Sequence, residues 1–157
     1  MGFDTSEEAL NQAKKASIGL PLVFRQHKAQ ELLPAEDGSQ NLVLDMMVSH
    51  FLNKEEREKL RKEIVRVLKP DGWLFLKTFL LDEDRNAKQL LREHSGVEAG
   101  SYIHPTFGTT EYVLTEEEIM KELEGLFTIH ASKKSHAHLL HGRAHKRRSI
   151  SLYAQKK

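Results

Sequence analysis

Residues 41–80 read NLVLDMMVSHFLNKEEREKLRKEIVRVLKPDGWLFLKTFL, and this stretch decides the fold class. Its first part, Asn41 to Val48, is nearly all apolar, which predicts a strand covered on both faces. Asn53 can cap a following helix, whose apolar side chains recur at helical spacing at Leu60, Ile64, Val67 and Leu68. Residues 69–72 (KPDG) end that helix, and Trp73 to Leu80 is a second buried strand. The stretch therefore predicts a parallel βαβ unit.

The residues before this unit follow a similar pattern. Thr5 and Glu8 have the spacing of a capping box, which predicts a helix that reaches about Lys15. Leu20 to His27 is a short apolar and β-branched run, and we expect a strand there. The N-terminal region thus adds a helix and a strand to the α/β pattern.

The residues after the unit predict two helices and a closing hairpin. Asp82 can cap a helix that reaches His94, and Ser95 to Glu111 is expected to be a loop. Thr115 and Glu118 form a second capping box before another helix. Two β-prone runs, 127–130 and 150–154, have no helix between them, so we expect an antiparallel pair joined by a long basic loop. The whole chain is predicted to be one α/β domain, residues 1–157, with a mostly parallel sheet.

The amino-acid composition excludes several classes of protein and of site. No apolar run approaches the ~20 residues that cross a bilayer, and no signal-peptide pattern opens the chain, so we expect no membrane partner. The chain has no cysteine. This excludes disulfides, thiolate metal sites and a cysteine nucleophile, and it fits a cytoplasmic protein.

Charge is distributed unevenly along the chain. Residues 125–157 hold eight basic and no acidic residues, whereas residues 1–124 hold 16 basic and 23 acidic ones, a net charge of −7. A basic end can attract nucleic acid, but a solvated basic hairpin is favoured. Four histidines of this region fall within a span of ten residues, His136, His138, His141 and His145. The surrounding Lys and Arg repel cations, so we expect no metal site there.

Ligands of α/β folds bind at the carboxyl ends of the strands, which here means residues 4–6, 27–29 and 45–50. Four motifs accompany these segments: GFDTS at 2–6, QHKAQELLP at 26–34, MVSHFL at 47–52 and RVLKPDGW at 66–73. Together and in this order they resemble class I S-adenosylmethionine-dependent methyltransferases. The resemblance covers the whole chain, with the specific motifs within residues 2–79, and it implies an incomplete Rossmann-like sheet that ends in an antiparallel hairpin.

The resemblance implies a set of residues that bind S-adenosylmethionine. Asp4 stands where an acidic side chain accepts hydrogen bonds from both ribose hydroxyls. Lys28 occupies the position of an adenine-binding acid in many members; a lysine cannot accept, and the backbone amide of Ala29 is the alternative contact. Asp45 and Met46 are placed at the floor of the pocket, although Met46 also suits the core.

Candidate catalytic and acceptor-binding residues follow from the same resemblance. His50 follows a buried strand at the pocket, where it is expected to orient the acceptor or act as a base, unless it is a structural histidine. Asp45 is costly in an apolar run unless it is hydrogen-bonded or faces the site. Tyr102 and His104 lie in the loop that covers the substrate in this family, and an ordinary loop role is the alternative.

One diagnostic part of the family has no counterpart in this sequence. None of the nine glycines forms the glycine-rich loop that follows the first strand, so we expect a domain that is truncated before its second strand. The strand at 41–48 would then have an exposed edge, which can pair with a second copy.

The predicted function is methyl transfer from S-adenosylmethionine to an unidentified small-molecule acceptor, with the activity of this chain alone in doubt because of the missing loop. The alternative is a non-catalytic module that binds nucleic acid or protein through its basic C-terminal hairpin.

Overall fold

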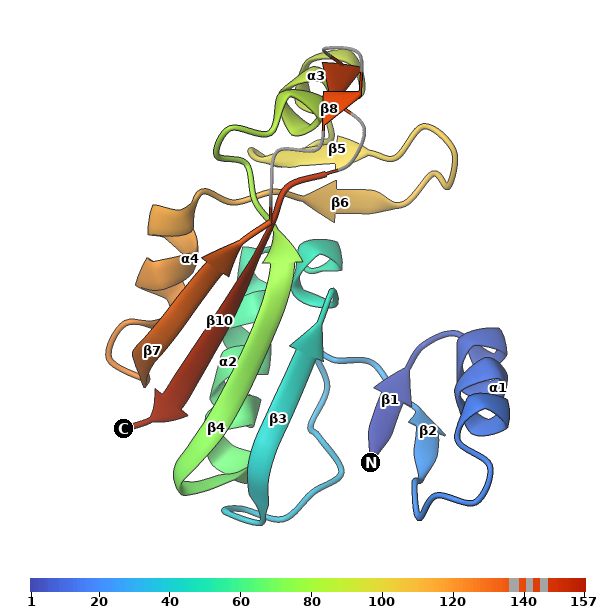
Figure 1. The fold of residues 1–157 in the computed structure, drawn as a ribbon, viewed down its shortest axis with the longest axis vertical. Coiled ribbons are helices and arrows are strands. Elements are labelled where there is room, and N and C mark those ends of the chain that lie inside the picture. The colour runs from blue at the N-terminus through green and yellow to red at the C-terminus, as the bar shows by residue number, and fades with distance from the viewer. Residues whose placement is uncertain (136–138, 141–142, 145–146) are drawn as a thin grey trace. The chain divides into compact units, whose positions relative to one another are not determined.

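The computed structural model describes residues 1–135, 139–140, 143–144 and 147–157 (Figure 1). Their contacts divide them into two compact units, Met1–Pro34 and Ala35–Lys157. None of the described helices is long and apolar enough to cross a membrane. The four C-terminal histidines considered as metal ligands, His136, His138, His141 and His145, lie outside the described residues.

The first unit is a small βαβ arrangement. Strands β1 (Gly2–Asp4) and β2 (Phe24–Gln26) are parallel, and helix α1 (Glu7–Ala16) connects them. Leu10 is the buried residue of α1. The predicted helix and strand are thus present, but the cap is Ser6 and not Thr5, because the Ser6 side chain accepts from the Ala9 N–H. The strand is also shorter than the predicted run.

The second unit is built on a four-stranded sheet. Its strands are β3 (Gln40–Met46), β4 (Leu68–Phe79), β7 (Phe127–Lys134) and β10 (Ser149–Lys156), in the order β3-β4-β10-β7. β3 and β4 are parallel, whereas β10 is antiparallel to both β4 and β7. The predicted βαβ unit and the antiparallel C-terminal pair are confirmed.

Two capped helices cover one face of this sheet, behind it in Figure 1. α2 (Lys54–Val67) begins with an Asn53–Glu56 capping box, and α4 (Glu116–Leu123) begins with a Thr115–Glu118 capping box. The apolar side of α2 meets the buried side of the sheet, and both contribute to the core: Leu60, Ile64, Val67, Leu74, Leu76, Ile150 and Leu152. Burial of such side chains stabilises a fold by roughly 1.5–3 kcal/mol each, before the entropy of ordering is counted.

The opposite face of β3 departs from the prediction that both faces are covered. Leu42, Leu44 and Met46 are 52%, 60% and 49% exposed. Among the described residues, β3 also pairs on one side only, with β4. The apolar run therefore forms an edge strand with one buried face, because no described helix of the second unit packs on the other.

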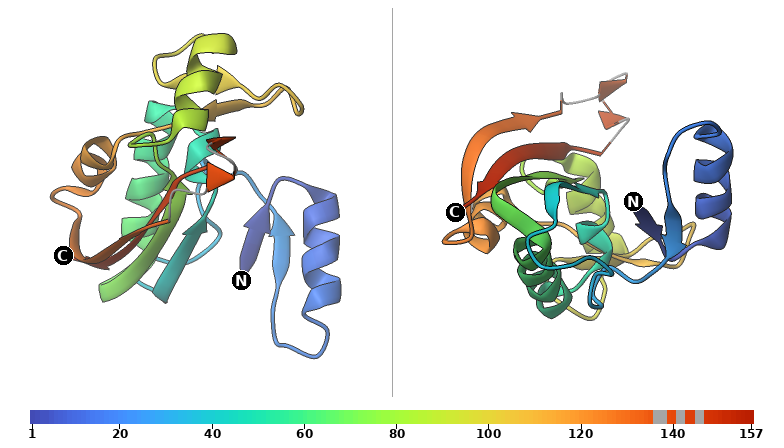
Figure 2. Two further views of the ribbon diagram at one scale, coloured as in Figure 1. Left: turned by 45° about the horizontal axis from the view of Figure 1, so that its top comes forward. Right: turned by 90° about the horizontal axis from the view of Figure 1, so that it is seen from below.

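Beyond the carboxyl end of β4 lies a smaller cluster of helix and hairpin. α3 (Arg85–Glu93) packs against β5 (Ser101–Ile103), which pairs antiparallel with β6 (Thr110–Tyr112), as the left view of Figure 2 shows. Its core is Ala87, Tyr102 and Val113. Asp84, and not Asp82, caps α3, and residues 95–111 contain most of a hairpin instead of a plain loop. A 3-10 turn, η1 (Ser49–Phe51), follows β3, and the two-residue strands β8 (Leu139–Leu140) and β9 (Arg143–Ala144) lie in the basic segment.

Candidate functional site

The carboxyl ends of β1 and β2 bring two predicted cofactor contacts together within the first unit. Asp4 lies opposite Gln26, and its carbonyl accepts a hydrogen bond from the His27 amide at 3.0 Å. The exposed Asp4 carboxylate accepts from the Ser6 amide at 2.8 Å through Oδ1, while Oδ2 accepts from no described residue. The Ala29 amide likewise donates to no described residue. A carboxylate and an amide with unused capacity are thus held at adjacent strand ends.

Lys28 precedes Ala29 in the chain, and its side chain is exposed to solvent. Its ammonium forms a surface ion pair with Glu31 at 3.6 Å, with both side chains more than half exposed. Exposed pairs of this kind contribute about 0–1 kcal/mol, so Lys28 is not fixed strongly. The Lys28 ammonium has only hydrogen-bond donors, so it cannot accept a hydrogen bond from an adenine amino group.

Asp45 lies at the end of β3 in a buried hydrogen-bond network. Its Oδ2 accepts from the Arg61 guanidinium at 2.8 Å and from the Ser49 hydroxyl, and Oδ1 accepts from the backbone of η1. Arg61 also donates to the Ser49 hydroxyl at 2.7 Å. Asp45 is 4% and Arg61 is 3% exposed. These hydrogen bonds offset the cost of burying the Asp45 carboxylate, and they connect the end of β3 to α2.

The two methionines after Asp45 behave differently. Met46 points to the exposed face of β3, opposite to Asp45, as the alternation of a strand requires. Met47 has φ 62°, in the left-handed region that side chains other than glycine rarely adopt. Its amide is held by the Lys77 carbonyl at 2.8 Å, and the Asp45 carboxylate accepts from the Val48 amide at 3.3 Å. These bonds hold a strained turn where the strand ends, a kind of feature that often marks a functional site.

His50 lies in η1, between two aromatic rings. Its ring centroid is 3.9 Å from that of Phe51 and 4.7 Å from that of Phe79, and the residue is 5% exposed. Its Nδ1 atom is buried without a hydrogen-bond partner among the described residues. Burial lowers the pKa of His50 from 6.5 to about 4; the Glu111 and Asp45 charges oppose this shift, and the Arg147 charge adds to it. The imidazole is therefore neutral at pH 7, with a lone pair available for a proton.

A second buried polar cluster lies beside His50 and joins segments far apart in the chain. The Tyr102 hydroxyl donates to the Glu111 carboxylate and accepts from Arg147. Arg147 also donates to Asp84 at 2.9 Å, and its guanidinium lies 4.4 Å from the centre of the Phe79 ring. Burial and the Glu111 carboxylate raise the pKa of Tyr102 to about 12, so its hydroxyl stays protonated. The Tyr102 side chain is fully buried, and it belongs to this polar cluster.

Sequence reasoning missed Glu111 and Arg147 in this cluster. Glu111 lay at the end of an expected loop, and Arg147 was one of several basic residues in the C-terminal region. Their pairing depends on the β5–β6 register, in which Tyr102 lies opposite Glu111. The three residues of β6 are too few to show an alternating pattern of apolar and polar residues. No local signal in the sequence therefore predicted that Tyr102 and Glu111 would lie opposite each other.

His104 has a local role in the β5–β6 connection. Its Nδ1 accepts from the Thr106 amide at 3.2 Å, and its ring stacks on Phe107 with centroids 4.6 Å apart. These contacts shape the turn. That His104 also contacts an acceptor stays a prediction.

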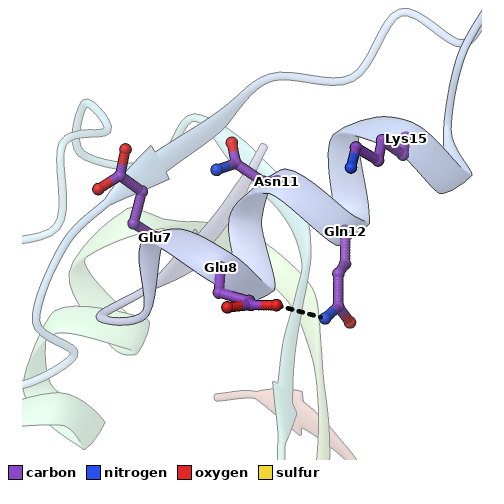
Figure 3. A pocket seen from close by; sticks show the side chains of 5 residues that line it. All are labelled: Glu7, Glu8, Asn11, Gln12 and Lys15. Atoms are coloured by element: carbon purple, nitrogen blue, oxygen red, sulfur yellow. Dashed lines mark hydrogen bonds between the residues drawn. The ribbon is translucent and has the colours of Figure 1, made fainter.

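The surface hollow in Figure 3 does not coincide with any of these groups. It lies along the solvent side of α1 and is lined by Glu7, Glu8, Asn11, Gln12 and Lys15. All five side chains are exposed, and the Gln12 amide donates to Glu8 at 3.4 Å. This is the wet face of an amphipathic helix and not a built site.

The described residues fit part of a nucleoside cofactor. Asp4 can accept from a vicinal diol and the Ala29 amide can donate to a base edge, both with unused capacity. No glycine in the described residues follows the carboxyl end of a parallel strand, where a backbone cradle would hold an amino-acid moiety. The described strand ends therefore offer a carboxylate oxygen and a backbone amide, but no glycine cradle, for such a cofactor.

Residues 1–76 match the model of a methyltransferase domain family. No curated protein matches the chain. Among solved structures, a SAM-dependent methyltransferase from Methanosarcina mazei has a TM-score of 0.80 at 23% identity, over 99% of this chain and 80% of that one. A Thermotoga maritima protein described as a possible histamine N-methyltransferase has a TM-score of 0.68 at 19% identity, over 100% and 73%.

A third structure contains bound ligands. It is the 1,6-didemethyltoxoflavin-N1-methyltransferase of Burkholderia thailandensis with 1,6-didemethyltoxoflavin and S-adenosylhomocysteine, which has a TM-score of 0.67 at 19% identity, over 99% of this chain and 60% of that one. At these identities the likeness concerns the fold, and it extends over nearly the whole chain.

Proposed function

We propose that this chain, which has the fold of class I S-adenosylmethionine-dependent methyltransferases and matches a methyltransferase domain family over residues 1–76, methylates a small-molecule acceptor. The cofactor of this class is S-adenosylmethionine. The observation that carries the proposal is the pair of unused groups at the ends of β1 and β2, the Asp4 carboxylate and the Ala29 amide. A small acceptor is supported by the Burkholderia relative, whose bound substrate is a small molecule.

In this proposal the first unit binds the nucleoside. Asp4 accepts hydrogen bonds from the two ribose hydroxyls through Oδ2, while Oδ1 stays on the Ser6 amide. Ala29 donates its amide to the adenine edge. Lys28 takes no direct part, because its ammonium cannot accept and already pairs with Glu31. When bound, S-adenosylmethionine supplies an electrophilic methyl group on a sulfonium.

The second unit provides the candidate base. At a neutral imidazole nitrogen, His50 would take up the proton that the acceptor loses on methylation and pass it to water. Asp45 supports this site indirectly, since its oxygens are engaged with Arg61, Ser49 and the η1 backbone. Direct contact of Asp45 or Met46 with the cofactor stays a prediction.

Calorimetric titration with S-adenosylmethionine tests the proposal. We expect Asp4→Ala to weaken binding at least about tenfold, which corresponds to the loss of one or two hydrogen bonds to a charged acceptor. Glu7→Ala, which removes an exposed carboxylate on α1, is the matched control and should bind like the wild type. No binding by the wild type, or equal affinities for Asp4→Ala and the wild type, would contradict it.

For a macromolecular partner, we propose a second copy of the chain paired along β3. Three large apolar side chains on this strand are about half exposed, and its one charged residue, Asp45, is engaged by Arg61 on the other face. A free strand edge without unpaired charge is suited to strand addition.

A further inference from the structure

Packing places the β5–β6 hairpin against the turn that carries His50. β6 contacts η1, and Glu111 lies in the middle of β6. The Glu111 carboxylate favours the charged form of His50, so it opposes the lowering of the His50 pKa by burial. Glu111 is 5% exposed, so little water screens this interaction.

The Glu111 carboxylate is held by a tyrosine hydroxyl and, among the described residues, forms only a long ion pair. The Tyr102 hydroxyl donates to Oε2, and Arg147 Nη1 lies 4.0 Å from the same oxygen. The closer partner of Arg147 is Asp84, at 2.9 Å. Two buried carboxylates thus share one guanidinium, which leaves an excess of negative charge beside His50.

The three charges that act on His50 come from three different elements. Glu111 on β6 and Asp45 on β3 are negative, and Arg147, which precedes β10, is positive. Asp45 is compensated at 2.8 Å by Arg61. Both His50 and Arg147 contact the Phe79 ring, and the Arg147 charge opposes a charge on His50. Glu111 is therefore the carboxylate best placed to favour a charge on His50.

We propose that Glu111 is a positioning residue of the reaction: its carboxylate, held by Tyr102, stabilises the imidazolium that forms when His50 takes up the acceptor's proton. This rests on the proposed function of His50 as the base. Burial alone makes protonation of His50 costly, and an opposite charge nearby offsets part of that cost. Without Glu111, His50 keeps its place but becomes a weaker proton acceptor.

The test measures protonation of His50 directly, with no substrate. In 15N-labelled protein, the His50 ring nitrogens, assigned by their loss in His50→Gln, report the protonated fraction between pH 4 and pH 7.5. With a pKa of about 4, about a tenth of His50 is protonated at pH 5. We expect Glu111→Gln to lower that fraction by about three- to tenfold, as loss of one nearby opposite charge predicts.

The direction of the change separates this role from a structural one. A substitution that merely loosens the packing exposes His50 to water and raises its protonated fraction, because burial is the main cause of the low pKa. Glu98→Gln is the matched control, because Glu98 also accepts from a tyrosine hydroxyl, that of Tyr112 at 3.0 Å, but is exposed and does not act on His50. It should leave the fraction unchanged.

Glu111→Asp keeps the charge one methylene further back and should give an intermediate fraction, which also tests the proposal if Glu111→Gln does not fold. An unchanged or raised fraction in folded Glu111→Gln overturns the inference, whether or not the chain binds S-adenosylmethionine. Failure of the wild type to bind S-adenosylmethionine contradicts the proposed methyl transfer, and the His50 titration is unaffected by that result.

Discussion

Asp45 is the residue at which the sequence left two roles open. Its carboxylate is 4% exposed, and its four hydrogen-bond contacts come from Arg61, Ser49 and the adjoining backbone. A buried ion pair contributes little beyond a well-packed apolar pair, but the loss of one partner leaves a charge buried alone. Arg61 and Asp45 therefore depend on each other, and the end of β3 depends on both.

Arg61→Met should destabilise the chain by about 3–5 kcal/mol, because it leaves the Asp45 charge unpaired in the core. The free energy of unfolding in urea measures this. Asp45→Leu combined with Arg61→Met should regain part of the loss, since no charge then remains. The exposed pair of Glu55 and Lys59 is the control, and Glu55→Gln should leave the urea midpoint unchanged. A loss below about 1 kcal/mol for Arg61→Met would show that the network is not important for stability.

His50 should make the stability of the chain sensitive to mild acid. Its folded-state pKa of about 4 lies below the value of 6.5 expected in the unfolded chain. As the pH falls from 6.5 towards 4, the unfolded chain takes up a proton that the folded chain does not, so unfolding becomes more favourable. At pH 5 this contributes about 1–2 kcal/mol.

Urea unfolding at pH 7.5 and pH 5.0 measures this contribution. The decrease in stability between the two pH values should be smaller in His50→Gln than in the wild type by about that 1–2 kcal/mol. Any loss of packing caused by His50→Gln lowers its stability equally at both pH values, so it cancels when the two pH values are compared. His94→Gln, an exposed histidine, should behave like the wild type. Equal decreases in His50→Gln and the wild type would mean that His50 titrates normally in the folded chain.

At the scale of elements, β3 is the strand whose environment differs most from its sequence pattern. A run such as NLVLDMM suits the interior of a parallel sheet, but in the second unit it has one covered face and one paired edge. An apolar strand with a free edge is a pairing site unless charge blocks it. The exposed apolar face and free edge of β3 are therefore the basis for proposing that the chain self-associates.

Leu44→Lys should reduce self-association, because it places a charge on the exposed face of β3, where Leu44 is 60% exposed. Light scattering coupled to size-exclusion chromatography, over a range of protein concentrations, should show a mass that rises with concentration for the wild type and a monomer for Leu44→Lys. Val97→Lys changes an exposed side chain outside the sheet and should associate like the wild type. A wild type that stays monomeric at all concentrations would rule out pairing along β3.

At the scale of the whole molecule, the two units differ in how much structure holds them. The first has a two-stranded sheet with three residues in each strand, and the second has a four-stranded sheet over a contiguous core. Local stability follows buried contacts and protected hydrogen bonds. The proposed nucleoside groups therefore lie on the less stable unit.

Amide hydrogen exchange should reflect this difference. Peptides that cover β1 and β2 should exchange at least about tenfold faster than peptides that cover β4 and β10. S-adenosylmethionine should slow exchange at residues 27–29 if the first unit binds the nucleoside, because ligand binding stabilises the closed state. Equal protection of both units, or protection by the ligand at β4 alone, would contradict this assignment.

The sequence by itself determined most of the local elements and their order along the chain, but not the β5–β6 hairpin, which was expected to be a loop. Capping boxes at Asn53 and Thr115 and the helical spacing of Leu60, Ile64 and Val67 are local signals, because they depend on residues within two turns of helix. The same holds for the βαβ unit and the C-terminal pair, whose connections are short or lack a helix. The four motifs at 2–6, 26–34, 47–52 and 66–73 together also predicted the methyltransferase fold, which the solved structures confirm.

Only the tertiary structure decided which side chains meet. Arg61 reaches Asp45 across 16 positions, and Arg147 reaches Asp84 and Tyr102 across 63 and 45 positions. Such contacts depend on sheet register and helix packing, which no local pattern of residues encodes. The free edge of β3 was inferred from the family's strand order, but the exposure of Leu42, Leu44 and Met46 followed only from the packing. The sequence thus determined most of the elements, and the environments of His50 and Glu111 came from the long-range contacts between them.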